Sequence, residues 1–263
     1  MSPGGGNGLE FSLRSLIEPV STLFFPSFCY VCGERQPQAD LHVNVCRQCW
    51  SGIREIGDAV CFRCGIPIES TPEDLPDAYF CSRCRVKQVP YKMMRSLYRY
   101  ETPLREMIRL FKFEGMLDLG CEFARRLAGW VAGIRGLRDA DLVIPVPLHP
   151  LRRIERGFNQ SRILARAVAG ELGKPIPRHG ALWELKRVRN TPPQSLLEPD
   201  DRRRNVRGAF EAVIPRLLRG KKVLLVDDVA TTETTVRECA RVLRRAGAEE
   251  VVVLTLARSL TAV

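Results

Sequence analysis

The chain has 263 residues and a formal net charge of +11, and this length allows one full domain core plus a smaller module. The positive excess lies entirely beyond residue 90. It favours an anionic partner, a polyphosphate or a nucleic acid, although a basic solvated surface has the same composition. No stretch reaches the roughly 20 apolar residues of a membrane span, which argues against an integral membrane protein. The glycine-rich N-terminus lacks the basic start of an export signal, so we expect a cytoplasmic location.

Residues 1–27 form the first predicted segment. Apolar residues from Leu13 to Phe24 recur at helical spacing, which predicts an amphipathic helix with one face packed on the next module. The segment has no basic face, and this disfavours a helix that lies on a membrane surface.

Residues 28–88 contain four C-x-x-C pairs, formed by Cys29, Cys32, Cys46, Cys49, Cys61, Cys64, Cys81 and Cys84. A C-x-x-C turn brings two thiolates to one ion, and two such turns complete the closed Cys₄ set of a structural zinc site. The spacing therefore predicts a small double zinc ribbon that binds two Zn²⁺, with the pairs combined either in sequence or interleaved. Disulfides would need an oxidising compartment, and iron–sulfur motifs use tighter or less regular spacing.

Residues 89–263 alternate between helical and strand patterns. Helices are predicted at 102–113, 119–134, 159–172 and 235–247, and apolar strands at 141–148, 223–228 and 250–257. The near-continuous Val, Ile and Leu in these strands indicate a parallel sheet covered on both faces, and so an α/β fold. Cys121 and Cys239 share helical faces with apolar residues and are predicted to be small core residues.

An irregular, mostly basic arm at about 186–207 interrupts this pattern. Its three prolines and high polarity do not suit a core element. Such an arm could fold over a ligand and exclude water, or it could be a solvated surface loop.

The pattern from Val223 to Thr235 predicts a strand, an acidic pair and a hydroxyl-rich turn at which a helix begins. A helix N-terminus attracts phosphate, and the hydroxyls of Thr231, Thr232, Thr234 and Thr235 add donors. Asp227 and Asp228 can hold ribose hydroxyls or Mg²⁺. Ligands of open parallel sheets bind beyond the carboxyl ends of the strands, so Pro145 to Pro147 could face the same crevice. The pattern predicts a site for a phosphorylated sugar.

Five motifs in this order resemble the competence-protein ComF family: the C-x-x-C repeats, FKFEG (111–115), IPVPLHPLRRIERGFNQS (144–161), RNTPPQSLLEPDDRRRNVRGAF (189–210) and VLLVDDVATTETT (223–235). The resemblance runs from about Cys29 to Arg258. It implies a double zinc ribbon joined to a type I phosphoribosyltransferase-like domain, which has a parallel-sheet α/β fold. Members of the family are associated with DNA uptake in natural transformation.

The resemblance also implies roles for individual residues. Asp227 and Asp228 would be the catalytic pair that holds the ribose hydroxyls of phosphoribosyl pyrophosphate and its Mg²⁺, and the four threonines would receive the 5′-phosphate. Pro145, Val146, Pro147 and His149 would form the pyrophosphate loop. Arg152, Arg153 and Arg156 would lie nearby as charge partners. Lys112, Arg187 and Gln194 also belong to matched motifs, with less specific roles. A nucleophile would attack C1 of the ribose as pyrophosphate leaves, without a nucleophile from the protein.

Glu233 departs from the family pattern, which usually has glycine at this position. Glycine suits a turn wrapped on phosphate because its backbone is free. An uncompensated carboxylate at about 4 Å from the phosphate, at an effective dielectric of about 20, would cost on the order of 4 kcal/mol, or roughly a thousandfold in affinity. The alternative is a side chain that points into water at the first helical turn.

Two functions follow. The first is a Mg²⁺-dependent phosphoribosyltransferase with an unidentified acceptor, favoured by the aspartate pair and the pyrophosphate loop. The second is a non-catalytic accessory factor with a degraded phosphate site that binds single-stranded DNA or a DNA-uptake protein; Glu233, the basic arm and the zinc module favour it. A third hypothesis is a regulatory protein that binds a nucleotide.

Overall fold

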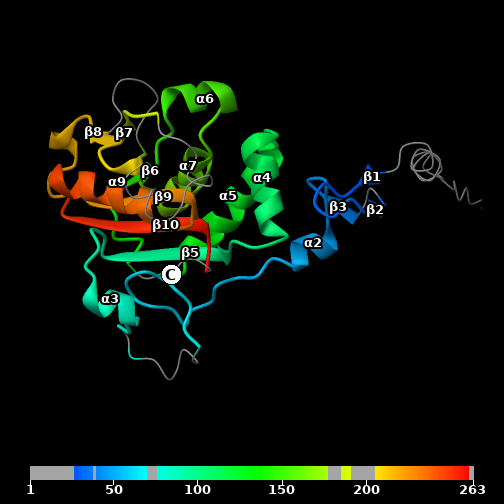
Figure 1. Cartoon of the computed structure of the whole chain (residues 1–263), viewed down its shortest axis with the longest axis horizontal. Coiled ribbons are helices and arrows are strands. Elements are labelled where there is room, and N and C mark those ends of the chain that lie inside the picture. The colour runs from blue at the N-terminus through cyan, green and yellow to red at the C-terminus, as the bar shows by residue number, and fades with distance from the viewer. Residues whose placement is uncertain are drawn as a thin grey trace, which may run out of the picture. The chain divides into compact units, whose positions relative to one another are not determined.

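The computed structural model describes residues 27–37, 40–69, 76, 78–134, 136–176, 185–190 and 205–260 (Figure 1). The predicted N-terminal helix, Gln194 and residues 191–204 of the basic arm lie outside these ranges. The chain divides into two compact units, Met1–Gly52 and Ile53–Val263. Within the described ranges, no helix is long and apolar enough to cross a membrane.

The unit Met1–Gly52 is built from very short elements. Strand β1 (Ser27–Phe28) pairs with β2 (Arg35–Gln36), β3 (Leu41–His42) pairs with β4 (Val45–Cys46), and α2 (Arg47–Ser51) follows. In the described part of this unit the buried apolar side chains are Val45 and three cysteines. So little apolar burial cannot offset the entropy of folding, so the unit depends on metal binding.

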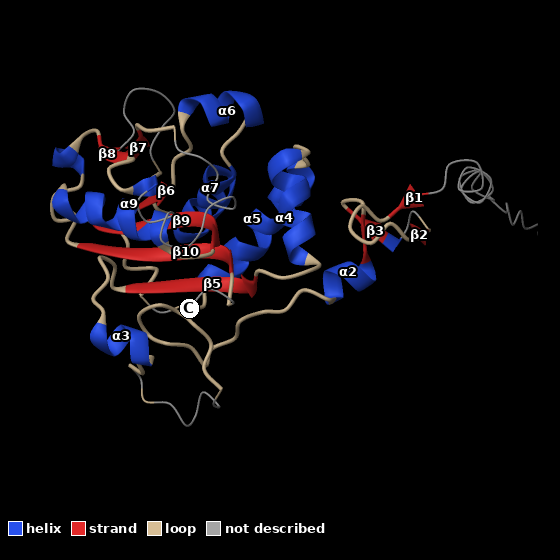
Figure 2. Cartoon of the chain, in the orientation of Figure 1, coloured by secondary structure: helices blue, strands red, loops and turns tan. Residues whose placement is uncertain are grey.

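The unit Ile53–Val263 contains a four-stranded parallel sheet in the order β5-β10-β9-β6 (Figure 2). Its strands are β5 (Met93–Arg99), β10 (Glu250–Arg258), β9 (Lys222–Ala230) and β6 (Leu142–Pro145). The three strands expected from their apolar runs are confirmed. The parallel register pairs Pro145 with Val226, so β6 and β9 end at the same edge of the sheet.

Helices cover both faces of this sheet. Helix α9 (Thr234–Arg245) packs Cys239, Ala240 and Leu243 against one face. The other face carries α7 (Gln160–Leu172), which contacts β9 and β6, and α5 (Leu117–Val131), which packs on α7. Helix α4 (Leu104–Phe113) lies against α5, and the short α6 (Pro150–Arg156) follows β6. These helices confirm the predicted α/β fold.

Cys121 and Cys239, the two cysteines outside the clusters, differ in burial. Cys239 is fully buried, as predicted, whereas the prediction for Cys121 is wrong because its side chain is exposed. The buried stripe of α5 runs through Phe123 and Leu127. Leu117, Cys121 and Arg125 are four residues apart and therefore form the solvent-facing stripe.

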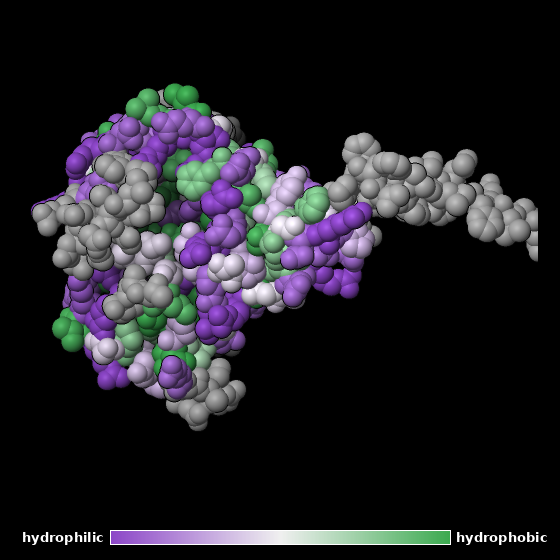
Figure 3. All heavy atoms as spheres, turned by 45° about the vertical axis from the view of Figure 1, so that its right-hand side comes forward, coloured by the Kyte–Doolittle hydropathy of each residue, from purple (hydrophilic) through white to green (hydrophobic). Residues whose placement is uncertain are grey.

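Smaller elements complete the second unit. Strands β7 (Leu185–Arg187) and β8 (Phe210–Ala212) form an antiparallel pair, followed by the 3₁₀ turn η4 (Pro215–Leu217). Helix α3 (Ser82–Val86) belongs to the second cysteine cluster. On the face shown in Figure 3 hydrophilic residues predominate, and hydrophobic residues gather at the top, over α6, where Ile154 is 77% exposed.

Candidate functional site

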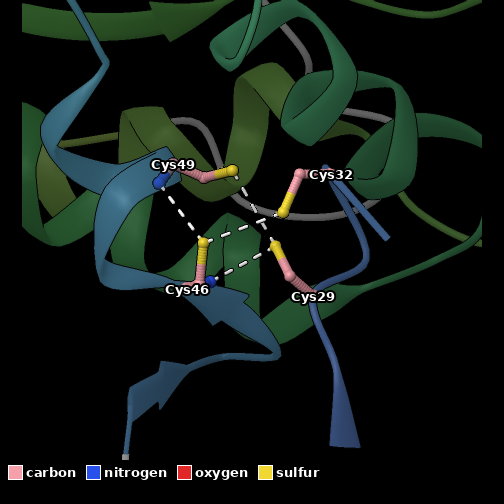
Figure 4. A group of neighbouring side chains, drawn as sticks. All are labelled: Cys29, Cys32, Cys46 and Cys49. Carbon is pink, nitrogen blue, oxygen red and sulfur yellow. Dashed lines mark hydrogen bonds between the residues drawn. The ribbon is translucent and has the colours of Figure 1, made fainter. Parts of the chain in front are cut away.

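The eight paired cysteines form two separate clusters. Cys29, Cys32, Cys46 and Cys49 make the first, and Cys61, Cys64, Cys81 and Cys84 the second; within each, the four Sγ atoms lie within 4.8 Å of one another. The pairs therefore combine in sequence and are not interleaved. In Figure 4 the four thiols of the first cluster point toward one another from the turn after β1, from β4 and from α2.

The sulfur spacing fits zinc. The Sγ atoms of Cys29 and Cys49 are 3.8 Å apart, and those of Cys64 and Cys81 are also 3.8 Å apart. A regular tetrahedron with Zn–S bonds of about 2.3 Å has edges of about 3.8 Å. Backbone N–H groups also donate to the sulfurs, for example Cys46 N to Cys29 Sγ at 3.3 Å and Cys81 N to Cys61 Sγ at 3.3 Å. Such bonds stabilise thiolates, so both clusters are closed Cys₄ sites suited to structural zinc.

The acidic pair lies at the carboxyl end of β9, where strand pairing fixes its backbone. Asp227 Oδ1 accepts a hydrogen bond from Ser161 Oγ at 2.8 Å, and Asp228 Oδ2 pairs with Lys112 Nζ at 2.8 Å. Ser161 stands in the first turn of α7 and Lys112 in the last turn of α4. Two helices and one strand that are far apart in sequence, α4, α7 and β9, thus meet at the acidic pair.

The two carboxyls of the pair differ in environment. Burial raises the pKa of Asp227 to about 7, and repulsion from Asp228 adds to this shift; the Ser161 hydroxyl and Lys112 oppose it. A carboxyl with a pKa near neutrality can accept or release a proton when a ligand binds beside it.

The segment after β6 lies next to the pair. Val146 N donates to Val226 O at 2.8 Å, and Asn159 Nδ2 donates to Val146 O at 3.1 Å. Asn159 Oδ1 also accepts from Ser161 N, which caps α7. His149 caps α6 in the same way, through Leu151 N. Both caps are local, because each side chain accepts from the backbone N–H two residues further along the chain.

Several cations predicted from the sequence surround the site. Arg156 carries a charge that interacts with Asp228, and Arg187 interacts with both Asp227 and Arg152; burial lowers the pKa of Arg156 and of Arg187. A cavity of about 560 Å³ lies beside them, lined in part by Pro147, Arg153 and Arg187. Of the residues predicted for the pyrophosphate loop, Pro147 lines this cavity, together with Lys186 and Arg187 from the described start of the basic arm.

The hydroxyl-rich turn joins β9 to α9. Thr232 and Thr234 hydrogen-bond to each other through their hydroxyls at 2.7 Å, and Ala230, Thr231, Thr234 and Thr235 line a small hollow at the helix N-terminus. Glu233 lies between them with φ of 60°, the left-handed region that favours glycine. Its backbone thus takes the conformation that the family's usual glycine would supply.

The Glu233 side chain does not point into water. Only 3% of the residue is exposed, and its carboxylate contacts the guanidinium groups of Arg83, Arg237 and Arg258 at 2.6, 2.8 and 2.9 Å. Tyr91 Oη donates a fourth contact at 2.9 Å. Burial alone raises the pKa of the Glu233 carboxyl, but the three arginines outweigh it and hold the pKa below its ordinary value. The charge is compensated, so the condition for a thousandfold loss of phosphate affinity is not met.

Sequence reasoning gave no role to Ser161, Asn159, Tyr91 or Arg258. The first two belong to the motif that ends in GFNQS, directly before a helical pattern, so their capping positions could have been found. Tyr91 and Arg258 are separated from Glu233 by 142 and 25 positions, and no local spacing indicates such contacts.

Two family models match the chain. The "Double zinc ribbon domain" matches residues 20–87 and the "Phosphoribosyl transferase domain" matches residues 160–261. Together with the parallel sheet and the cysteine clusters, they define the class: a double zinc ribbon followed by a phosphoribosyltransferase-like domain.

Similar proteins make the assignment more specific. The chain is 34% identical to "DNA utilization protein YhgH" of Salmonella typhimurium, over 90% of this chain and 100% of that protein. It is 31% identical to "Competence protein F" of Haemophilus influenzae, over 90% and 99%. The chain belongs to the ComF family, which includes these proteins and "Competence protein ComFC" of Bacillus subtilis.

Among solved structures, glutamine phosphoribosylpyrophosphate amidotransferase from B. subtilis is 26% identical and covers 52% of this chain and 25% of its own, with a TM-score of 0.34. The fold assignment therefore rests on the family matches and the strand order.

Proposed function

We propose that the phosphoribosyltransferase-like domain binds phosphoribosyl pyrophosphate with Mg²⁺, and that the chain acts in DNA uptake, as the name of its Haemophilus relative suggests. One observation carries the proposal: two carboxylates held at the end of a parallel strand stand directly before a hydroxyl-lined helix start. A carboxylate pair suits ribose hydroxyls and Mg²⁺, and the helix start suits a phosphate.

The residues around the pair have complementary roles in this proposal. Lys112 neutralises Asp228 in the free protein and would be shared with, or displaced by, an arriving cation. Arg152, Arg153 and Arg156 lie on α6, beside the loop that would receive pyrophosphate. They would stabilise the negative charge that develops on pyrophosphate as the bond to C1 breaks and an acceptor attacks.

Calorimetric titration of phosphoribosyl pyrophosphate with Mg²⁺ tests the binding. We expect wild type to bind and Asp228→Asn to bind at least tenfold more weakly, since it loses one charge at the ribose position. Asp118→Asn is the matched control because Asp118 is exposed in the first turn of α5. Wild type that shows no heat at millimolar ligand would overturn the proposal.

Transfer is tested separately from binding. Slow release of pyrophosphate and ribose 5-phosphate from the bound ligand, with water as the acceptor, would indicate that the site activates C1. Binding without any such release, and without release in the presence of nucleobase or amine acceptors, would assign the domain to binding alone.

A second candidate, a single-stranded DNA-binding accessory factor, is favoured by a groove beside α9. Arg207, Arg237, Arg241 and Arg245 line this groove of about 310 Å³. Arginine clusters bind the phosphate backbone with strong salt dependence. We expect titration at two salt concentrations to show weaker binding at high salt, and Arg207→Ala with Arg245→Ala to weaken it further. Neutralising Arg125, exposed on α5, is the control; absence of binding at low salt would end this candidate.

A further inference from the structure

The second cysteine cluster lies against the parallel sheet through backbone contacts. Met94 N, in β5, donates to Arg63 O at 2.8 Å, between Cys61 and Cys64. Gly65 lies so close to β5 that a Cβ atom there would stand 2.4 Å from Met94 O. Its φ of +66° also favours glycine. The cluster is therefore docked on the sheet in one position, independently of any side-chain ion pair.

Two of the three arginines around Glu233 depend on this cluster for their positions. Arg83 lies in α3 between Cys81 and Cys84, so a metal ion held by these two thiolates would fix its backbone from both sides. Arg258 ends β10 and donates to Cys64 O from one guanidinium nitrogen and to Glu233 Oε1 from another. Arg83 and Arg258 therefore both link the second cysteine cluster to the carboxylate of Glu233.

That carboxylate belongs to the hydroxyl-rich turn of residues 231–235, which is the phosphate-binding turn in the proposed function. Glu233 and its neighbour Thr234 both line the hollow at the start of α9. The Glu233 carbonyl also accepts the hydrogen bond of Arg237 N in the first helical turn. The left-handed backbone at Glu233 is unfavourable for a residue with a side chain and persists only if its surroundings hold it. The buried contacts to three guanidinium groups supply that restraint.

We propose that Arg83, Glu233 and Arg258 are positioning residues for the phosphate-binding turn, and that the metal of the second cysteine cluster is required for phosphate affinity at that turn. This inference rests on the proposed function for its ligand. It differs from a purely structural role, in which loss of Arg83 would lower stability and leave both the turn and its affinity unchanged.

Two charge-matched variants in one helix separate these roles. Arg83→Met removes the Glu233 contact. Arg85→Met removes an arginine two positions further on, which is exposed and donates to Phe80 O. We expect both proteins to retain two Zn²⁺. Arg83→Met should bind phosphoribosyl pyrophosphate with Mg²⁺ about tenfold more weakly and exchange the amide hydrogens of residues 231–236 faster in the free protein. Arg85→Met should match wild type in both measurements.

The result that overturns the inference is an Arg83→Met protein with wild-type affinity and wild-type exchange at residues 231–236. If Arg83→Met does not fold, Arg83→Lys replaces it, since lysine keeps the charge but cannot match the guanidinium geometry. If wild type does not bind the ligand, the proposed function fails. Hydrogen exchange of the turn then decides the positioning role alone: faster exchange in the Arg83 variant supports that role, and unchanged exchange overturns it.

Discussion

Glu233 combines an unfavourable backbone with a favourable side chain. The left-handed conformation costs about 1 to 2 kcal/mol for a residue with a Cβ atom. The carboxylate pairs with Arg258, whose side chain is 2% exposed, and removing one partner of a buried pair typically costs about 3 to 5 kcal/mol. We therefore expect Glu233→Gly to lower the free energy of unfolding by roughly 1 to 4 kcal/mol, measured by urea denaturation.

Glu233→Ala is the informative companion because it loses the carboxylate and keeps the Cβ atom. The difference between the alanine and glycine variants isolates the backbone term, and alanine should be less stable by about 1 kcal/mol. A glycine variant that is as stable as wild type, or more stable, would contradict the role of the buried pairs.

Asp227 predicts a pH dependence of stability. Burial and repulsion from Asp228 raise its pKa to about 7, above the value of about 3.9 in an unfolded chain. Between these values the folded state keeps a proton that the unfolded state loses, so stability falls as pH rises and is constant again above about pH 7.

Asp227→Asn removes this titration while its amide oxygen can still accept from Ser161. The stability of the variant minus that of wild type should increase by about 2 kcal/mol from pH 5.5 to 7 and change little from pH 7 to 8.5. Urea denaturation without Mg²⁺ measures it, with Asp118→Asn as the control. A difference that stays constant over this pH range would mean that Asp227 is ionised throughout.

Among the elements, those with a simple apolar period could be predicted from the sequence. Strands β6, β9 and β10 are runs of Val, Ile and Leu because helices cover both of their faces. Strand β5 has no such run, since Arg95 donates to Phe62 O in the second cysteine cluster and Ser96 hydrogen-bonds to Thr255. Its polar positions are satisfied by distant segments, which no local pattern reveals.

The candidate site likewise has some parts that are local in sequence and others that depend on contacts between distant segments. The aspartate pair, the threonine turn and each C-x-x-C pair are local in sequence, so these candidate residues could be found from the sequence. The environment of Glu233 could not, because Arg83 is 150 positions away and reaches it only when the second cluster docks on the sheet. The negative charge of Glu233 follows from its residue type, whereas its arginine partners are brought together only by the fold.

The start of α7 predicts an effect on the loop after β6. Asn159 caps the helix through Oδ1 and also donates from Nδ2 to Val146 O. Asn159→Asp keeps an oxygen for the cap and loses the donor, whereas Asn159→Ala loses both. We expect alanine to lower the free energy of unfolding by about 1 to 2 kcal/mol and aspartate to lower it less. Chemical denaturation measures this order, and equal losses would show that the cap contributes nothing.

For the whole molecule, the two cysteine clusters belong to different compact units, so loss of each metal should have a different effect. The first cysteine cluster lies in Met1–Gly52, whereas the second lies in the same unit as the parallel sheet. Metal analysis of the full chain should give about two Zn²⁺. Loss of the first ion should unfold the first cluster alone, since its described part buries little apolar surface besides its cysteines.

Two double substitutions test this difference within the full chain. Cys29→Ser with Cys32→Ser should leave one Zn²⁺ per chain and an unchanged affinity for phosphoribosyl pyrophosphate. Cys61→Ser with Cys64→Ser should also leave one Zn²⁺. It should weaken the affinity by tenfold or more, because Arg83 and the Cys64 carbonyl lose their fixed positions beside Glu233. Equal affinity in the two proteins would mean that each metal stabilises only its own ribbon. Weaker affinity in the Cys61 and Cys64 protein alone would mean that the second metal supports the ligand site.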